Sequence, residues 1–305
     1  TLRSDISVKM DNLVNFGDYL NLSGTETFNA KLSIDENASL ELSSNLSNTT
    51  FSSNIDELNK RSSDNLKTKI LISDLSQPTY EIKNNKFSAF INNDNGYFSL
   101  GSSFDEDIKK LNFIDGFYIF LELDELKIEN LALENQLNDD SNLKLIKLKI
   151  KQLDFFNNIY FDQIFEINFS GDETESFFYG NNLNGTLRID SSGFTRIDVF
   201  DTKFEFKGVN IFDSTDAFKL NDVNLRFVRK NIQTFDDVFQ NIDFYFLKNK
   251  TITTIDNIKI SSKNFNIGPS SKNEKAYISY NNQNDLYKIR GSFEFDNQKD
   301  LLGKL

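Results

Sequence analysis

The 305-residue chain contains no histidine, cysteine or tryptophan, and only 2 prolines. The lack of histidine excludes Ser-His and Cys-His catalysis and imidazole metal sites. The lack of cysteine excludes disulfides, zinc–thiolate clusters and thiol nucleophiles. Long hydrophobic runs are also missing, because the longest, Phe117 to Leu121, is far too short to span a bilayer. Any enzyme built from this chain would use Asp, Glu, Lys, Tyr or Ser.

Positive charge is scarce relative to negative charge. Lys and Arg together number 34, against 46 Asp and Glu, and the net charge is −12 at pH 7. A chain this acidic lacks the basic surface of a nucleic-acid binder. It is also a poor candidate for holding anionic lipid headgroups by charge. We therefore expect no nucleic-acid partner.

Phenylalanine, in contrast, is abundant, with 31 residues, and hydrophobic residues make up 38% of the chain. We attribute most of this bias, together with the many Asn, Lys, Ile and Asp residues, to the codon usage of an AT-rich genome. The apolar content is nevertheless sufficient for a real hydrophobic core, so wholesale disorder is not expected.

Alternation of apolar and polar residues dominates the sequence, and this period of two predicts β-strands with one buried face. Phe28, Ala30, Leu32 and Ile34 alternate with polar residues, and Leu40 follows after a polar turn. Such segments recur roughly every 10 to 20 residues, a spacing typical of antiparallel meanders and not of βαβ units. The predicted fold class is all-β, with a mostly antiparallel sheet.

Helical signals are few, and we expect at most one or two short helices. Ser103 through Leu111 predicts one, with Ser103 as its cap and three acidic residues in its first turn. Thr234 to Ile242 has apolar residues at helical spacing, although its flanks favour strand. We treat residues 1–305 as one continuous β-segment with a soft break near residues 103–116.

Three acidic clusters carry the residue types that a calcium site or a carboxylate pair needs. They are Asp105–Asp107, Gly171–Glu175 and Asp236–Asp237. Helix capping and solvated turns explain these clusters more simply. The glycines form no phosphate-binding motif, and turns and bulges account for them. We predict no catalytic residue, no metal site and no cofactor.

The apolar rows are the one feature that is both abundant and regular. They fit the packed interior of a β-sandwich or barrel. They fit equally an open, curved sheet whose concave apolar face holds acyl chains. Periodicity alone does not decide between these two structures, because both give the same alternation.

The order of several motifs points to a known family. Gly24, Phe28 and Leu32 have the spacing G-x-x-x-aromatic-x-x-x-Leu, and a Leu-x-Leu-x-Ser-x-Leu segment follows from Leu40. Further matching stretches are Asn182–Ile189 with Arg196–Phe200, Phe239–Phe246 with Ile252–Ile260, and Arg290–Phe295 with Asp300–Gly303. In this order of motifs, residues 20 to 305 resemble the AsmA-like YhdP/TamB family of Gram-negative envelope proteins.

The resemblance implies an elongated sheet that forms a U-shaped hydrophobic groove. It also implies a periplasmic protein, anchored in the inner membrane by a segment not present in this chain. The family is associated with phospholipid movement between the inner and outer membranes, without a cofactor and without bond chemistry. We accordingly expect the chain to be an internal piece of a longer protein, with phospholipid acyl chains as its partner and contacts to both membranes made by regions outside it.

A groove for acyl chains needs a continuous apolar face without a deep local pocket, since each buried CH₂ is worth about 0.8 kcal/mol. The residues that we expect to line it share the apolar positions of the alternating segments. They are Phe28, Ala30, Leu32, Ile34, Leu40, Leu42, Ile70, Ile72, Phe165, Ile167, Leu187, Ile189, Phe204, Phe206, Phe244, Phe246, Ile258, Ile260, Phe293 and Phe295.

Two other functions remain open at the level of the sequence. One is a structural or adhesive extracellular β-protein with a closed core. The other is a carboxylate-based glycan hydrolase or lyase, which would need two acidic residues converging in a cleft.

Overall fold

A computed structural model gives the three-dimensional structure of the chain. It describes residues 1–10, 20–34, 38–53, 55–93, 95–111, 116–128, 142–155, 158–171, 173–192, 194–200, 223–234, 237–248, 251–262, 265–281, 283–284 and 286–295.

The described elements are almost entirely strands. They are β1 (Leu2–Lys9), β2 (Leu20–Ile34), β3 (Ala38–Ser44), β4 (Thr49–Ser53), β5 (Thr68–Ser73), β6 (Thr79–Lys83), β7 (Phe87–Asn92), β8 (Asn95–Leu100), β9 (Phe117–Ile128), β10 (Leu143–Phe155), β11 (Asn158–Ser170), β12 (Glu173–Tyr179), β13 (Asn184–Ile189), β14 (Thr195–Phe200), β15 (Val223–Thr234), β16 (Asp237–Lys248), β17 (Ile252–Ser262), β18 (Phe265–Gly268), β19 (Tyr277–Asn281), β20 (Leu286–Arg290) and β21 (Ser292–Phe295). A 3₁₀ turn, η2 (Asp56–Leu58), and a short helix, α1 (Asp105–Ile108), accompany them. The predicted all-β, mostly antiparallel class with at most two short helices is confirmed.

The chain divides into two compact units, which are described separately below. Unit 1 comprises Thr1–Asp124 with Asn142–Lys149, and unit 2 comprises Glu125–Ser141 with Ile150–Leu305. Strands β9 and β10 contribute residues to both units. The expectation of one continuous groove segment over residues 1–305 stays a prediction.

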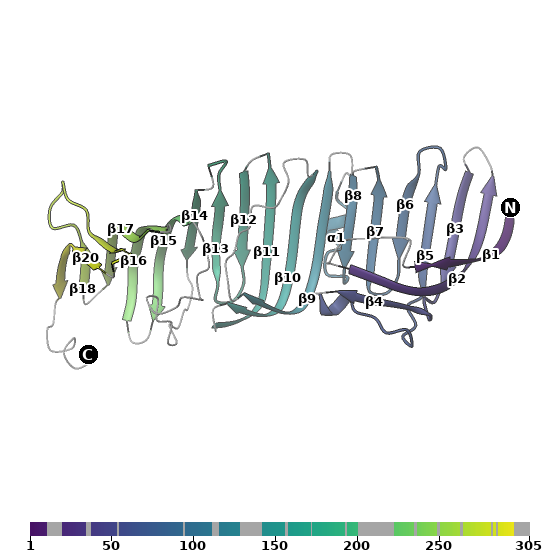
Figure 1. Cartoon of the computed structure of the whole chain (residues 1–305), viewed down its shortest axis with the longest axis horizontal. Helices are drawn as coiled ribbons and strands as arrows, with labels where there is room; N and C mark the ends of the chain where they lie inside the picture. Colours follow the sequence, from purple (N-terminus) through teal and green to yellow (C-terminus); the bar gives the residue numbers. More distant parts are fainter. Residues whose placement is uncertain are drawn as a thin grey trace. The chain divides into compact units, whose positions relative to one another are not determined.

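Unit 1 is built by strands that pair in the order β1, β2, β3, β5, β6, β7, β8 and β9 (Figure 1). These pairings are antiparallel except that between β8 and β9, which is parallel. Strand β4 leaves this order and pairs with the first part of β2. Because β2 has 15 residues, its two halves serve different partners: Leu20–Gly24 pairs with β4 and Asn29–Ile34 with β3.

Unit 2 continues the same construction. Strands β11 to β14 pair antiparallel in chain order, β14 and β15 pair parallel, and β15 to β17 are again antiparallel. The long strand β17 then pairs with two strands. Its first half pairs with β19 and its second half pairs with β18. Strand β20 pairs with β19, and strand β21 pairs with β18.

Of the two predicted helical segments, the first contains a helix and the described residues of the second are strands. A helix does form within the predicted segment, but α1 is only one turn long and begins after Phe104. Ser103 does not cap it, because its hydroxyl donates a hydrogen bond to Glu122 Oε2 at 2.7 Å. The second expectation was wrong: β15 reaches Thr234 and β16 begins at Asp237, and both are strands. No helix in the described part of the chain has the length and apolar character needed to cross a bilayer.

Candidate functional site

Strand register places the apolar residues of unit 1 in straight lines across its sheet. Two such lines run from β1 to β9, and we call them row 1 and row 2. Row 1 consists of Leu2, Leu32, Leu40, Ile72, Tyr80, Ile91, Gly96 and Phe117. Row 2 consists of Ser4, Ala30, Leu42, Ile70, Ile82, Ala89, Phe98 and Ile119. Alternate residues share a face of a strand, so both rows lie on one face, opposite to charged residues such as Lys31 and Glu41.

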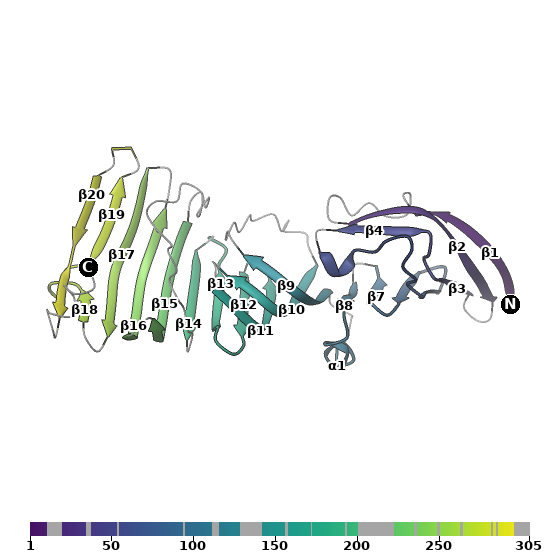
Figure 2. The same cartoon turned by 90° about the horizontal axis from the view of Figure 1, so that it is seen from below.

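A cap covers part of this apolar face. The cap is the segment Leu46–Leu66, which contains β4 and η2. Its residues Leu46, Phe51 and Leu66 form a buried cluster with Phe28, and Leu42 and Ile70 of row 2 pack against that cluster. Figure 2 shows β4 on one side of β7 and β8, and α1 on the other side. Row 2 therefore lies partly beneath a closed hydrophobic core.

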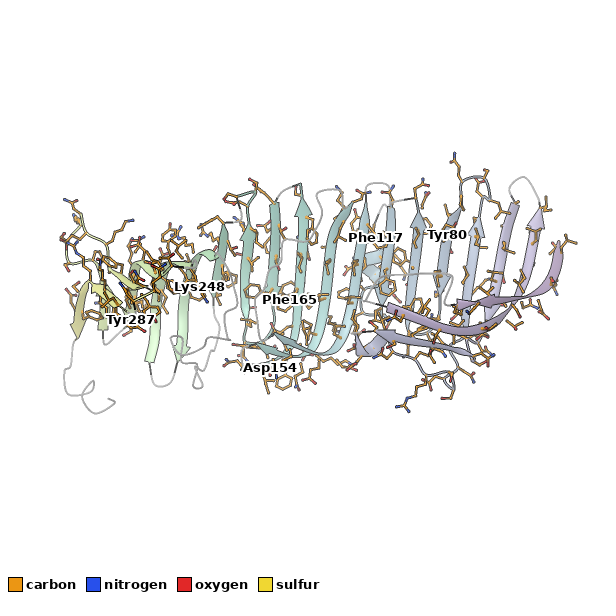
Figure 3. All side chains as sticks on the ribbon, viewed as in Figure 1. Tyr80, Phe117, Asp154, Phe165, Lys248 and Tyr287 are labelled. Atoms are coloured by element: carbon orange, nitrogen blue, oxygen red, sulfur yellow. The ribbon has the colours of Figure 1, made fainter. Side chains whose placement is uncertain are left out.

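Row 1 contains two exposed large apolar side chains. Leu2 and Tyr80 expose 66% and 38% of their surface, and Leu32, Leu40 and Ile72 are each half-buried. Tyr80 and Phe117, which belong to this row, are labelled in Figure 3. Row 1 thus presents a stripe of apolar side chains that water reaches.

Polar contacts tie the cap to the sheet through Glu26, a buried carboxylate on β2. It accepts hydrogen bonds from Ser44 Oγ at 2.6 Å, from the Asn48 main-chain N–H at 2.9 Å and from Thr49 Oγ1 at 3.2 Å. Burial by itself raises the pKa of Glu26, but these hydrogen bonds outweigh burial, so the pKa lies below its ordinary value. Glu26 therefore stays ionised and stabilises the entry into β4.

Lys60 joins two parts of the cap to each other. Its ammonium group is buried and donates hydrogen bonds to the main-chain carbonyls of Thr49 and Arg61 at 2.7 and 2.9 Å. The same group lies 5.9 Å from the centre of the Phe51 ring. Burial lowers the pKa of Lys60, and the negative charges of Asp64 and Glu26 offset part of this effect.

Register also aligns mostly apolar positions in unit 2, with Thr174, Thr195 and Ser176 between them. Row 3 consists of Phe169, Thr174, Ile189, Thr195, Leu225, Phe246, Ile255, Ile278 and Ile289. Row 4 consists of Ile167, Ser176, Leu187, Ile197, Phe227 and Phe244. In row 4 the rings of Phe227 and Phe244 stack with their centres 5.2 Å apart and their planes at 24°.

The apolar face of unit 2 is only half-buried. Leu187, Ile197 and Phe244 are of intermediate exposure, and at the C-terminal edge Ile289 exposes 63% of its surface. Rows 3 and 4 therefore hold apolar side chains, such as Leu187, Ile197 and Phe244, that remain partly open to water.

The opposite face of unit 2 carries ion pairs instead. Arg188 pairs with Glu175 at 2.5 Å, and Arg196 pairs with Asp198 at 2.7 Å. Arg226 makes two contacts with Asp243, from Nε to Oδ1 at 3.2 Å and from Nη2 to Oδ2 at 3.0 Å. The two faces of this sheet thus differ sharply in polarity.

No family model, curated protein or solved structure matches the chain. The resemblance to the AsmA-like family therefore stays a prediction.

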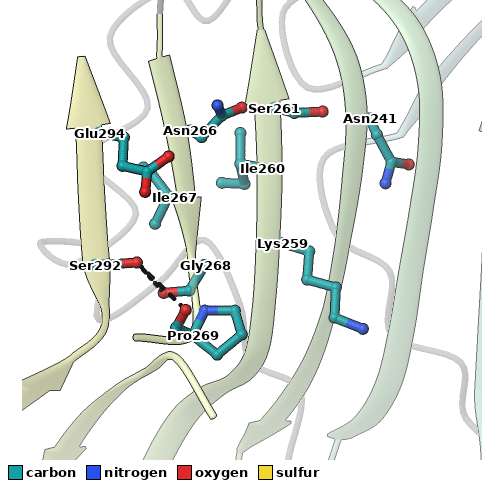
Figure 4. A pocket seen from close by; sticks show the side chains of 10 residues that line it. All are labelled: Asn241, Lys259, Ile260, Ser261, Asn266, Ile267, Gly268, Pro269, Ser292 and Glu294. Atoms are coloured by element: carbon teal, nitrogen blue, oxygen red, sulfur yellow. Dashed lines mark hydrogen bonds between the residues drawn. The ribbon is translucent and has the colours of Figure 1, made fainter. Parts of the chain in front are cut away.

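One depression lies on the polar face of unit 2 (Figure 4), and its volume is about 250 Å³. Register aligns four of its residues across neighbouring strands, namely Asn241, Ser261, Asn266 and Glu294. Ser292 Oγ donates to the main-chain carbonyls of Gly268 and Pro269, both at 3.3 Å. A second carboxylate is missing from its lining residues, so it does not supply the carboxylate pair of a glycan hydrolase.

The predicted acidic clusters are engaged in other contacts. Glu106 pairs with Lys109, Asp107 pairs with Lys147, and Glu175 pairs with Arg188. Asp172 and Asp236 lie outside the described residues. Among the residues that the structure describes, no group of three or more acidic side chains is arranged to hold a metal ion.

The predicted groove residues are distributed as follows. Register brings together Leu32 with Leu40, Leu40 with Ile72 and Ala30 with Leu42 across the sheet of unit 1. Phe28, Ala30 and Ile258 are buried, whereas Ile34 and Phe293 are exposed. Phe204 and Phe206 lie outside the described residues, as does the side chain of Phe295. That these residues line a groove stays a prediction.

Sequence reasoning missed several members of the rows. They are Tyr80, Ile82, Ala89, Ile91, Phe98, Phe117 and Ile119 in unit 1, and Ile197, Phe227, Ile255, Ile278 and Ile289 in unit 2. The alternation of Tyr80 with Ile82, and of Ala89 with Ile91, was the signal that could have identified the strands of unit 1.

Proposed function

We propose that the apolar faces of the two units hold the acyl chains of phospholipids, and that the protein moves these lipids between membranes without bond chemistry. The observation that carries the proposal is the alignment of half-exposed apolar side chains in rows 1, 3 and 4. An apolar partner would gain from contact with these side chains, because removing exposed apolar area from water is favourable in proportion to that area.

The length of row 1 supports a transient hold on the lipid. Eight positions at a strand spacing of about 4.8 Å make seven steps, or about 34 Å. One acyl chain in a bilayer leaflet spans about 15 Å, half of a hydrocarbon core about 30 Å thick. An acyl chain can therefore occupy several equivalent places along row 1. Such equivalence favours movement along the row over tight binding at one point.

The distribution of charge supports the same role. Ion pairs such as Arg226–Asp243 lie on the face opposite to rows 3 and 4, where they keep that side of the sheet hydrated. A headgroup would remain in water while only the acyl chains contact the rows. Holding the acyl chains and leaving the headgroup in water requires no cofactor and no catalytic residue.

The setting belongs to the proposal as well. Following the family resemblance, the protein acts in the periplasm, with phospholipids passing between the inner and outer membranes. A segment not present in this chain anchors it in the inner membrane.

The test uses native mass spectrometry and photocrosslinking on the protein purified from cells. We expect co-purifying phospholipid, and crosslinks to lipid from a photoreactive residue in place of Ile72 in row 1. The matched control replaces Leu71, which lies on the opposite face of the same strand, between Glu41 and Glu81. Absence of lipid from both measurements, or equal crosslinking from positions 71 and 72, contradicts the proposal.

A second pair of variants tests unit 2. Leu187→Asp places a charge in row 4, whereas Thr186→Asp places the same charge on the opposite face of β13. We expect Leu187→Asp to reduce the amount of bound lipid and Thr186→Asp to leave it unchanged. Circular dichroism checks that both variants retain their strands.

A structural or adhesive β-protein with a closed core is the second candidate. The specific observation that favours it is the cap, which buries Phe28 and Phe51 in a filled cluster. This candidate predicts a protein that is free of lipid and whose Leu187→Asp variant loses stability without losing any ligand.

A further inference from the structure

Strand β1 is an edge of the sheet in unit 1. In the described part of the chain it pairs with β2 alone, from Leu2 opposite Leu32 to Lys9 opposite Thr25. Its residues Leu2 to Ser7 are all exposed. An edge strand presents main-chain N–H and C=O groups that can pair with a strand from another molecule.

The charges on β1 are not balanced within the molecule. Arg3 lies directly opposite Lys31, and like charges at such a position destabilise a strand pair. Arg3 forms no ion pair with the described residues. Asp5, two positions further on, lies opposite Asn29 and accepts a hydrogen bond from its amide at 3.3 Å. An acidic group brought to Arg3 from outside would therefore be stabilising.

The apolar side of β1 is also incompletely covered. Leu2 and Ile6 expose 66% and 40% of their surface, on the face that carries rows 1 and 2. Val8, in contrast, packs against the cluster around Met10 and Phe28. The uncovered apolar area is thus concentrated in the first half of the strand.

We propose that two copies of the chain associate through β1, which pairs antiparallel with β1 of the second copy. Ser4 lies opposite Ser4 on the two-fold axis. Arg3 of each copy then faces Asp5 of the other, and Leu2 faces Ile6. The interface is self-complementary, as a two-fold dimer requires. It supplies Arg3 with a carboxylate, covers the exposed apolar residues, and does not depend on lipid binding.

Other registers are less favourable. A shift by one residue sets the apolar face of one copy against the polar face of the other. Centring the pair on Asp5 places two carboxylates opposite each other, and centring it on Ile6 places Arg3 opposite Lys9. A pair centred on Ser7 would match Asp5 with Lys9, but Lys9 already interacts within its own copy. That register also leaves Arg3 and Leu2 without cross-strand partners on β1.

Because the chain contains no cysteine, a single introduced thiol reports the register directly. We expect Ser4→Cys to form a disulfide-linked dimer under mild oxidation, since the two thiols meet at the axis. In the proposed register the two copies of residue 7 are six residues out of alignment, about 20 Å apart. Ser7→Cys should therefore crosslink no more than Ser270→Cys, an exposed loop position that reports random collision. Equal crosslinking of all three variants, or preferential crosslinking of Ser7→Cys, overturns the proposal.

Charge exchange supplies a second test that does not depend on oxidation. Arg3→Asp converts two attractive contacts per dimer into repulsive ones, so we expect the dissociation constant of the dimer to rise about 10-fold or more. Asp5→Arg should act in the same direction, and the Arg3→Asp/Asp5→Arg double variant should restore association. Sedimentation equilibrium at high protein concentration measures all four chains. A double variant that remains as weak as the single ones, or an unmodified chain that stays monomeric, contradicts the pairing.

Discussion

The carboxylate of Glu26 accepts the main-chain N–H of Asn48 over 2.9 Å, and this bond joins strand β2 to the loop that enters β4. Two further hydrogen bonds, from Ser44 and Thr49, end on the same carboxylate. One buried acidic group therefore accepts several of the hydrogen bonds that hold the cap over the apolar face of unit 1.

Glu26→Ala should destabilise unit 1 by about 2–4 kcal/mol, because it leaves the donors of Ser44, Asn48 and the fully buried Thr49 without their acceptor. Urea unfolding followed by circular dichroism measures the change. Glu41→Ala is the control, since Glu41 lies on the opposite face in a partly exposed pair with Lys69 and should cost less than about 1 kcal/mol. Equal losses in the two variants would show that the Glu26 bonds do not hold the cap.

Acid should weaken the same contact. The pKa of Glu26 lies below its ordinary value of 4.5 in the folded chain. The carboxylate therefore contributes stability that is complete above the ordinary pKa and is lost as the pH falls through the folded pKa. We expect the difference in unfolding free energy between the unmodified chain and Glu26→Gln to be constant above about pH 5.5 and to shrink at lower pH. A difference that stays constant down to pH 3 would contradict this.

Gly96 should tolerate no side chain. It adopts φ = +141°, and a Cβ atom built there would lie 1.9 Å from the carbonyl oxygen of Phe90 on β7. Gly96→Ala should therefore destabilise unit 1 by about 2–4 kcal/mol, by straining the backbone and displacing β8 from β7. Gly268→Ala is the matched control, because no atom lies within 4 Å of its Cβ position. Thermal unfolding of the two variants should differ clearly.

Even a conservative substitution in the Arg226–Asp243 pair should lower the stability of unit 2. Arg226 contacts Asp243 through two nitrogens and lies 5.4 Å from the centre of the Tyr245 ring. Arg226→Lys keeps the charge but loses the two-pronged contact, so we expect a loss of about 1 kcal/mol. The exposed Glu106–Lys109 pair provides the comparison, and Glu106→Gln should have almost no effect on stability. Urea unfolding measures both variants.

Local alternation predicted some of the strands, such as β2, β3 and β5, but not β6 to β9. Leu40 and Leu42 pair with Ile72 and Ile70 because their segments alternate in the same phase. A period of two determines which residues share a face, and hence which positions join a row once the strands are adjacent. The apolar face could therefore be anticipated, although its strand order could not.

Features that depend on distant contacts could not be predicted in this way. The segment Thr49–Ser53 has Phe51 as its only apolar residue, and its sequence does not indicate that β4 pairs with the first half of β2 and covers row 2. Phe239 and Ile242 have helical spacing, but Ile242 finds its partner in Ile260 of β17. Tertiary pairing decided both cases. The local alternation likewise does not indicate that β8 pairs parallel with β9 or that β14 pairs parallel with β15.

Strands β11 to β14 each pair with the strand that follows in the chain. Inserting or deleting one hairpin, which is two strands, would preserve the direction of every other strand and the side to which its residues point. Inserting or deleting a single strand would reverse the direction of the strands that follow it. We therefore expect evolutionary change in the size of this protein to proceed by duplication or loss of strands in twos. Each such event would lengthen or shorten rows 3 and 4 by two positions.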